Sequence, residues 1–179
     1  VREALPEVLV PDWPEDKTQY VAALSALRAF DLPSISQEDR ERTQQYAQER
    51  KREAVKAQVS NFDDWLKALE VKVSFAPLSA SNVARTTQLM NKTNQLNLST
   101  RRLTETELNA WAAEPGNEVF AVTVSDKYGD AGLTGILSLH RENGVCHIVD
   151  YVLSCRVMGR RVEETLVWAA TTRASELGC

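Results

Sequence analysis

The stretch that decides the fold is His147-Ile148-Val149-Asp150-Tyr151-Val152-Leu153, followed by Ser154-Cys155-Arg156-Val157-Met158-Gly159-Arg160-Arg161. The first seven residues form an apolar run of strand length, and the next eight form a basic loop that contains glycine. From Val162 towards Leu177 the pattern predicts a helix. A helix that begins after such a turn directs its unpaired backbone N–H groups at it, which favours an anion such as phosphate. The stretch therefore predicts a strand, a phosphate-binding loop and a helix.

The same loop supplies a candidate catalytic residue. Cys155 lies between the end of the predicted strand and two of the arginines. A thiol beside positive charge and a helix start ionises more readily and can act as a nucleophile. The alternative interpretation is a small buried residue at a strand end, because free cysteines are often buried and inert. The candidates for holding phosphate are Arg156, Gly159, Arg160 and Arg161.

Composition limits the classes of function. The chain has 179 residues, is 43% hydrophobic and carries a net charge of −4. This charge argues against broad nucleic-acid binding, which needs a basic face. No apolar run has membrane-spanning length, so no membrane partner is expected. The three cysteines, Cys146, Cys155 and Cys179, lack metal-ligand spacing, which predicts a cytoplasmic protein with no metal site in this chain.

The N-terminal part divides into two sections. Residues 1–14 are expected to be the tail of a larger α/β domain, because the short apolar strand Val8-Leu9-Val10 has no sheet to join. Residues 15–69 are expected to form a helical linker, with helices over 20–30, 36–58 and 62–69. Ser36 is expected to cap the second helix, and Ser60 or Asn61 to cap the third, which is amphipathic. The run Glu49-Arg50-Lys51-Arg52-Glu53 is interpreted as a solvated helix face. Docking of an acidic carrier protein is the alternative.

Residues 70–179 alternate between strands and helices. A strand over 71–76 precedes a helix capped by Ser79 or Ser81, and Thr104 with Glu107 forms a capping box for a second helix. Strands follow over 119–124 and 133–139, and Asn143-Gly144 is a hairpin signal before the strand from residue 145. The order is β-α-α-β-β-β-α, so the fold class is α/β.

A polar stretch from Asn91 to Arg102 is too long and too polar to be explained by packing, and loops of this kind often bind ligands. Its candidate substrate-binding residues are Lys92, Asn94, Gln95, Asn97, Arg101 and Arg102. The alternative is a surface loop whose side chains cap the adjacent helices.

Three further features carry weaker signals. His140 and His147 fall on predicted strands and are interpreted as hydrogen-bonded strand residues rather than general bases. Asp150 is expected to face away from His147, so the two would not form a dyad. The stretch from Asp126 to Gly132 is interpreted as a turn, because its acids are too few for a calcium loop.

The element order resembles the opening half of the GCN5-related N-acetyltransferase (GNAT) fold. In that fold a loop of pattern Q/R-x-x-G-x-G/A holds the pyrophosphate of coenzyme A. Arg156 and Gly159 match this pattern, and Arg161 stands where a small residue is usual. The resemblance implies a helical linker followed by a truncated GNAT-like mixed sheet.

Three segments are similar to motifs of the FkbH-like proteins. Residues 91–102 resemble the signature N-K-T-N-Q-F-N-L-T-T-R-R, residues 126–133 resemble D-R-F-G-D-x-G-L, and residues 153–160 resemble L-S-C-R-V-x-G-R. Members of this family join a haloacid-dehalogenase (HAD) subfamily IIIC phosphatase domain to a GNAT-like domain. Residues 1–14 would be the tail of the HAD-like phosphatase domain, and 70–179 the GNAT-like acyltransferase domain.

The resemblance implies an acyltransferase of polyketide-type biosynthesis that loads a glyceryl group, derived from 1,3-bisphosphoglycerate, onto an acyl carrier protein. The implied cofactor is the phosphopantetheine of that carrier, or coenzyme A, with Mg²⁺ expected only in the phosphatase domain. Cys155 would form the thioester intermediate. The alternatives are an acetyl-coenzyme A-dependent N-acetyltransferase and a non-catalytic docking module for the carrier protein.

Overall fold

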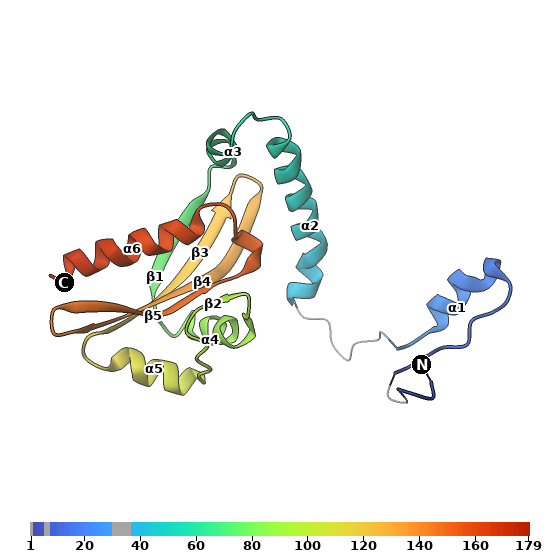
Figure 1. The fold of residues 1–179 in the computed structure, drawn as a ribbon, viewed down its shortest axis with the longest axis horizontal. Coiled ribbons are helices and arrows are strands. Elements are labelled where there is room, and N and C mark those ends of the chain that lie inside the picture. The colour runs from blue at the N-terminus through green and yellow to red at the C-terminus, as the bar shows by residue number, and fades with distance from the viewer. Residues whose placement is uncertain (1, 6–7, 30–36) are drawn as a thin grey trace. The chain divides into compact units, whose positions relative to one another are not determined.

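The computed structural model describes residues 2–5, 8–29 and 37–179, with only the backbone of residues 37–43 (Figure 1). The chain forms two compact units, Val1–Thr43 and Gln44–Cys179. The second unit contains residues 44–69 together with the sheet, whereas the sequence analysis placed a linker up to residue 69. The predicted cap at Ser36 lies outside the described residues.

The described residues of the first unit include one complete helix, which is short. A 3-10 turn, Lys17–Gln19, leads into α1, Tyr20–Ala26, which ends because Leu27 is extended. The predicted strand over 8–10 is wrong, because this segment is irregular and no ladder pairs with it in the described residues. The Val10 carbonyl instead accepts a hydrogen bond from the Arg2 guanidinium at 2.8 Å.

Helices α2 and α3 directly precede the sheet in the chain. Helix α2, Gln37–Lys56, begins in the first unit and ends in the second, and α3 covers Phe62–Leu69. Asn61 caps α3, because its side-chain oxygen accepts the N–H of Asp64 at 2.9 Å. Trp65 and Leu69 are buried, so the amphipathic pattern predicted for this helix is confirmed.

The sheet of the second unit has five strands in the order β1-β3-β4-β5-β2, and every ladder is antiparallel. The strands are β1 Lys72–Pro77, β2 Leu96–Asn97, β3 Asn117–Asp126, β4 Gly129–Glu142 and β5 Val145–Leu153. A mixed sheet was expected. The described sheet is antiparallel because tight turns join β3 to β4 and β4 to β5, and such turns reverse the chain.

Three helices complete this unit: α4 Val83–Lys92, α5 Glu105–Ala113 and α6 Val162–Glu176. The capping box at α5 is confirmed, since the Thr104 N–H donates to the Glu107 carboxylate at 2.7 Å. The serine cap predicted for α4 is wrong. The residue before α4 is Asn82, and its side chain binds the N–H of Ser79 and the carbonyl of Pro77 instead. The α/β class and the predicted order are confirmed, with β2 as an addition.

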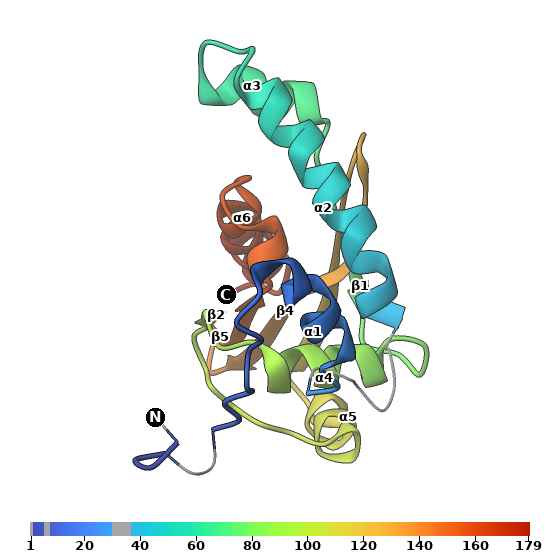
Figure 2. The same ribbon diagram turned by 90° about the vertical axis from the view of Figure 1, so that its right-hand side faces the viewer.

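The sheet is covered on both faces by helices (Figures 1 and 2). Alternate residues of β4 belong to different cores, because successive side chains of a strand point to opposite faces. Leu137 packs with Leu166 of α6, whereas Ile136 packs with Leu108 of α5 and Met90 of α4. Residues 154–161 join the end of β5 in the sheet to the start of α6 on one of its faces.

The turn from β4 to β5 confirms the Asn143-Gly144 hairpin signal. Both residues have positive φ angles, 51° and 76°, as a turn of this type requires. None of the helices in the described part of the chain is long and apolar enough to cross a membrane.

Candidate functional site

Cys155 begins a 3-10 turn, Cys155–Val157, directly after β5. Its side chain is exposed and forms no disulfide. Ser154, which precedes the turn, accepts a hydrogen bond from the Arg156 guanidinium at 3.4 Å, while Val157 is fully buried and fixes the turn to the core. The thiol therefore stands on an anchored turn at the surface, and the buried interpretation of Cys155 is wrong.

The loop between this turn and α6 contains two residues with positive φ angles. Gly159 has φ 73° and Arg161 has φ 56°, and α6 begins at Val162. The N–H of Gly159 donates to the Glu163 carboxylate at 2.7 Å. Glu163 and Glu164 both lie in the first turn of α6, where negative charge is favoured by the helix dipole. The start of α6 thus carries carboxylates of its own.

The loop brings the four candidate phosphate-binding residues together but not in equivalent environments. Arg156 is half-buried, and Arg161 is exposed and forms an ion pair with Asp63 at 2.7 Å. The Arg161 guanidinium also lies over the ring of Phe62. Arg160 is only 6% exposed and points into the protein. The loop therefore has Arg156 and Arg161 nearer the surface, whereas Arg160 is held inside.

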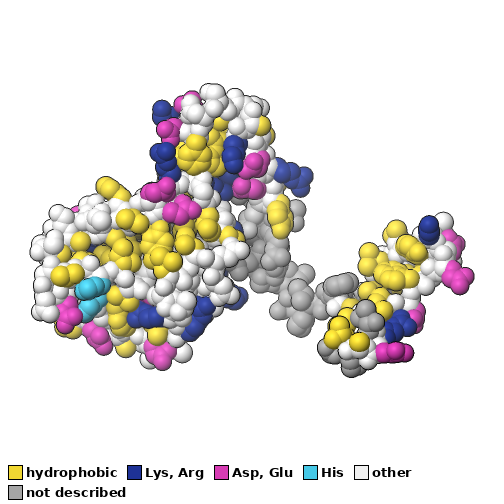
Figure 3. Space-filling model, in the orientation of Figure 1, with side chains coloured by type: hydrophobic (Ala, Val, Ile, Leu, Met, Phe, Trp, Pro, Cys, Tyr) yellow, Lys and Arg dark blue, Asp and Glu magenta, His cyan; other side chains and the backbone are white. Residues whose placement is uncertain are grey.

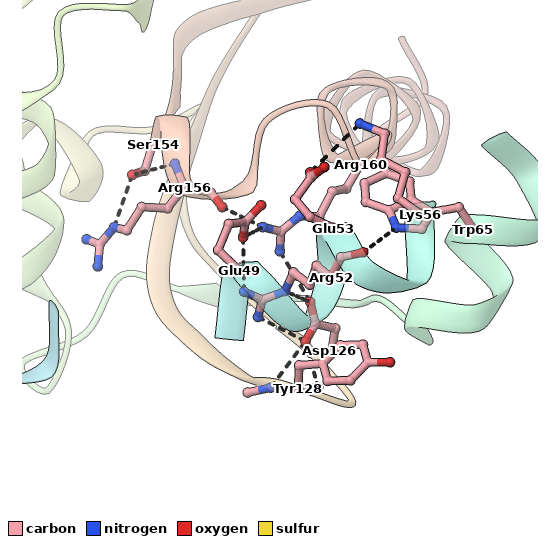
Figure 4. Close-up of polar contacts among 11 residues, drawn as sticks. Glu49, Arg52, Glu53, Lys56, Trp65, Asp126, Tyr128, Ser154, Arg156 and Arg160 are labelled. Carbon is pink, nitrogen blue, oxygen red and sulfur yellow. Dashed lines mark hydrogen bonds and ion pairs between the residues drawn. The ribbon is translucent and has the colours of Figure 1, made fainter. Parts of the chain in front are cut away.

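Arg160 belongs to a cluster of charged side chains that Figure 4 shows in close-up. Its guanidinium contacts Asp126 at 3.2 Å and Glu49 at 3.0 Å, and donates to the carbonyl of Arg156 at 2.9 Å. Arg52 of α2 forms a two-bond pair with Asp126, at 2.6 and 3.0 Å, and also contacts Glu49 at 3.1 Å. The run that was predicted to be a solvated helix face therefore supplies a buried arginine.

Asp126 lies at the end of β3, and its turn to β4 confirms the turn predicted for this segment. Burial of the Asp126 carboxyl opposes its ionisation, but hydrogen bonds from Arg52 and from the Tyr128 N–H outweigh this effect, together with the charge of Arg160. The pKa of Asp126 is therefore below its usual value. Sequence reasoning missed this role, because nothing in the sequence links Asp126 to arginines far along the chain.

The polar stretch from Asn91 to Arg102 folds largely on itself. The buried Asn97 donates to the carbonyl of Met90 at 3.2 Å and accepts the N–H of Thr100 at 2.9 Å. Arg102 donates to the same Met90 carbonyl at 2.6 Å and to the Asn94 side chain at 2.7 Å. These contacts favour the interpretation in which the side chains of this segment cap its neighbouring helix.

Arg101 turns inward from the same segment. It forms a two-bond pair with Asp150, whose side chain is fully buried, and its guanidinium lies over the ring of Trp111 at 4.5 Å. Lys92 and Gln95 are exposed. Of the six predicted substrate-binding residues, these two carry side chains that are exposed and outside the hydrogen bonds described above.

An apolar groove of about 450 Å³ connects this segment with the start of α6. Its lining residues are Leu96, Leu98, Ile148, Val149, Tyr151, Glu163 and Val167. The Tyr151 hydroxyl donates to the backbone carbonyl of Glu163 at 2.7 Å, which joins β5 to α6 below the groove. Burial, together with the charges of Glu163 and Glu164, raises the pKa of Tyr151. Figure 3 shows several groups of hydrophobic side chains on one face of the second unit, with polar and charged surface between them.

The histidines do not form a catalytic pair with Asp150. His140 is half-buried and contacts the Asn117 side chain through its ring nitrogen, and His147 is exposed. The prediction that Asp150 faces away from His147 is wrong. The register shift between Ser138 and Leu139 inserts one extra residue into β5, so His147, opposite His140, and Asp150, opposite Ser138, lie on the same face of the sheet. Among the described residues, no group of three His, Cys, Asp or Glu side chains could hold a metal ion.

The lowered carboxyl pKa values predict a loss of stability in acid. Burial opposes ionisation of Asp150, but Arg101 and Ser99 outweigh it, so its pKa is also below the ordinary value of 3.8. A carboxyl with a lowered native pKa contributes stability above its unfolded-state pKa and loses it as the pH falls through the native value. We expect the free energy of unfolding, measured in urea, to fall as the pH drops below 3.8, and Asp150→Asn to flatten this dependence.

The matched control for this titration is Asp130→Asn, because Asp130 is exposed on the neighbouring hairpin. That variant should keep the wild-type pH dependence. An unchanged pH dependence in Asp150→Asn would show that the pKa of Asp150 is the same in the folded and the unfolded protein, which would contradict the structural interpretation.

No protein-family model and no curated protein sequence matches the chain. Among solved structures, the chain is similar to a domain from Methanocaldococcus jannaschii DSM 2661, with 9% identity and a TM-score of 0.47, over 61% of this chain and 73% of that chain. It is also similar to spermidine N-acetyltransferase from Vibrio cholerae in complex with CoA and spermine, with 15% identity and a TM-score of 0.41. That match covers 57% of this chain and 63% of the acetyltransferase. At this level of similarity the two matches assign neither a substrate nor a reaction.

Proposed function

We propose that this chain is the C-terminal part of an FkbH-like acyltransferase that passes a small hydroxy-acyl group, such as glyceryl, to or from an acyl carrier protein. The observation that carries the proposal is the exposed thiol of Cys155 on an anchored turn between β5 and α6. A nucleophile that exchanges thioesters must be reachable by a bulky carrier and must be held in place. Cys155 meets both requirements.

The chemical step is an exchange of thioesters. The thiolate of Cys155 attacks the acyl carbonyl of the loaded carrier, a new bond forms between the cysteine sulfur and the carbonyl carbon, and the bond to the carrier sulfur breaks. The proton lost by the cysteine thiol ends on the carrier thiol. Atoms and charge balance without an oxidant or a further reactant.

The surface around Cys155 supports recognition of the phosphopantetheine arm of the carrier or of coenzyme A. Arg156 and Arg161 are the arginines of the loop that are not fully buried, and arginine suits phosphate because its fork donates two hydrogen bonds. The apolar groove beside α6 is large enough for an extended chain. One observation weighs against a tight phosphate site, since Glu163 already occupies the N–H of Gly159.

The test is intact-protein mass spectrometry after mixing the chain with a glyceryl-loaded carrier protein. The expected result is a glyceryl-sized mass gain that disappears in Cys155→Ala and persists in Cys179→Ala. The second variant is a matched control, because Cys179 is also an exposed free thiol. Carrier binding without a mass gain would contradict the proposal and favour a non-catalytic docking module. Acetyl transfer from acetyl-coenzyme A to an amine, unaffected by Cys155→Ala, would favour an N-acetyltransferase.

A further inference from the structure

Charged residues from three separate elements meet beside the Cys155 turn. Arg52 comes from α2, Asp126 from the end of β3, and Arg160 from the loop before α6 (Figure 4). Their side chains are only 6%, 1% and 5% exposed, whereas that of Glu49, the fourth member, is 48% exposed. A set of charges buried this deeply persists only when its members satisfy one another.

Both arginines share the same two acceptors. One oxygen of Asp126 accepts from Arg52 at 2.6 Å and from Arg160 at 3.2 Å. One oxygen of Glu49 accepts from Arg52 at 3.1 Å and from Arg160 at 3.0 Å. The position of the Arg160 side chain therefore depends on two carboxylates that also bind Arg52.

The two acceptors differ in freedom. The Asp126 carboxylate is fixed by the backbone N–H groups of Tyr128 and Gly129, at 2.9 and 3.2 Å. Glu49 lies one turn before Arg52 on α2 and is half-exposed, so without Arg52 it can turn to solvent. Loss of Arg52 would then leave Glu49 without one of its two arginine partners, and so weaken the contact between Glu49 and Arg160.

Arg160 in turn connects the two ends of the loop that follows Cys155. Its guanidinium donates to the backbone carbonyl of Arg156 at 2.9 Å, which ties the end of the loop to the residue directly after the cysteine. An arginine that is anchored in the protein and also binds this carbonyl holds the turn in one conformation. A guanidinium that is not anchored would leave the turn to its own short hydrogen bonds.

We infer that Arg52 is a positioning residue for the Cys155 turn, and that it acts through Glu49, Asp126 and Arg160. The side chain of Arg52 reaches the turn only through these shared contacts. An effect of Arg52 on acyl transfer rests on the proposed function. Its effect on the conformation of the Cys155 turn does not.

The test is hydrogen–deuterium exchange of the full chain, compared between wild type and Arg52→Gln. We expect backbone amides in residues 44–56 and in residues 155–161 to exchange about tenfold faster, the change expected when one charge-assisted hydrogen bond is lost. Peptides over the β4–β5 turn should not change. Arg50→Gln is the matched control, because Arg50 is exposed on the same helix. It should leave both segments as in wild type.

Faster exchange in residues 44–56 alone, with residues 155–161 unchanged, would overturn the inference. If Arg52→Gln speeds exchange in every segment, the variant has destabilised the whole fold, and Arg52→Lys is compared with wild type in its place. Lysine keeps the positive charge but loses the planar guanidinium. Arg52→Lys should speed exchange at both segments by less than tenfold and leave the β4–β5 turn unchanged. The experiment needs no carrier protein, so a failure of the acyl-transfer proposal and a failure of this inference give different results.

Discussion

Replacing Arg101 with alanine lowers the free energy of unfolding by about 3–5 kcal/mol. The cause is Asp150, whose side chain is fully buried in β5 and pairs with Arg101 through two hydrogen bonds. After the substitution the carboxylate keeps the Ser99 hydroxyl, at 2.7 Å, but no cation. Leaving a buried carboxylate without its cation lowers the free energy of unfolding by several kcal/mol. Replacing both charged partners by uncharged residues changes it far less. Urea unfolding followed by tryptophan fluorescence measures the difference.

The adjacent arginine is the natural control. Arg102 is exposed and binds a backbone carbonyl and an amide oxygen, so Arg102→Ala should cost only about 1 kcal/mol. Combining Arg101→Gln with Asp150→Asn should recover a large part of the loss, because both charges are then removed. A change of less than about 0.5 kcal/mol in Arg101→Ala would contradict the structural role and return Arg101 to the candidates for substrate binding.

The fold was predictable where the signals are local. The capping box of Thr104 and Glu107, the Asn61 cap and the Asn143-Gly144 turn each involve residues within four positions of one another, and each is confirmed. The physics of these motifs is contained in a few neighbouring residues, so the sequence alone is enough to predict them. The predicted cap of α4 failed because three polar residues compete there, and Asn82 precedes the helix without capping it by its side chain.

The site was predictable only in part, because side chains that are adjacent in the sequence have different surroundings. Arg160 and Arg161 are neighbours, yet the first is buried against Asp126 and the second is exposed. Arg101 and Arg102 differ in the same way. Which arginine turns inward depends on carboxylates that lie 34 or more positions away, as the Arg160–Asp126 contact shows. Periodicity and composition contain no information about such distant partners.

The different surroundings of the residues in the polar segment decide which of them are suitable for a test of substrate binding. Lys92 and Gln95 are exposed, and neither takes part in the pairs that hold the polar segment together. If the segment binds a hydroxy-acyl substrate or its phosphate, these two residues can contact it without first breaking one of the hydrogen bonds that hold the segment together. Variants at Arg101 would lose stability and substrate binding together, so they cannot separate a structural role of Arg101 from a role in binding.

Replacing Asp126 with alanine has the second largest expected effect, also about 3–5 kcal/mol. The substitution leaves Arg52 and Arg160 buried side by side, with only the half-exposed Glu49 between them. Two like charges in a poorly hydrated site repel each other, and each loses its hydrogen bonds to Asp126, which help to offset its burial. Asp126→Ala should therefore unfold at a much lower urea concentration than wild type.

The comparison with Asp130→Ala separates this effect from damage to the hairpin itself. Asp130 lies four residues later, is exposed, and accepts only the N–H of Gly132, at 2.7 Å, so its loss should cost about 1 kcal/mol. Adding Arg52→Met to Asp126→Ala should restore part of the stability, because it removes one of the two buried charges. If the double variant is less stable than Asp126→Ala, repulsion between the arginines is not the cause, and the contribution of Asp126 must come from its bonds to the backbone of the turn.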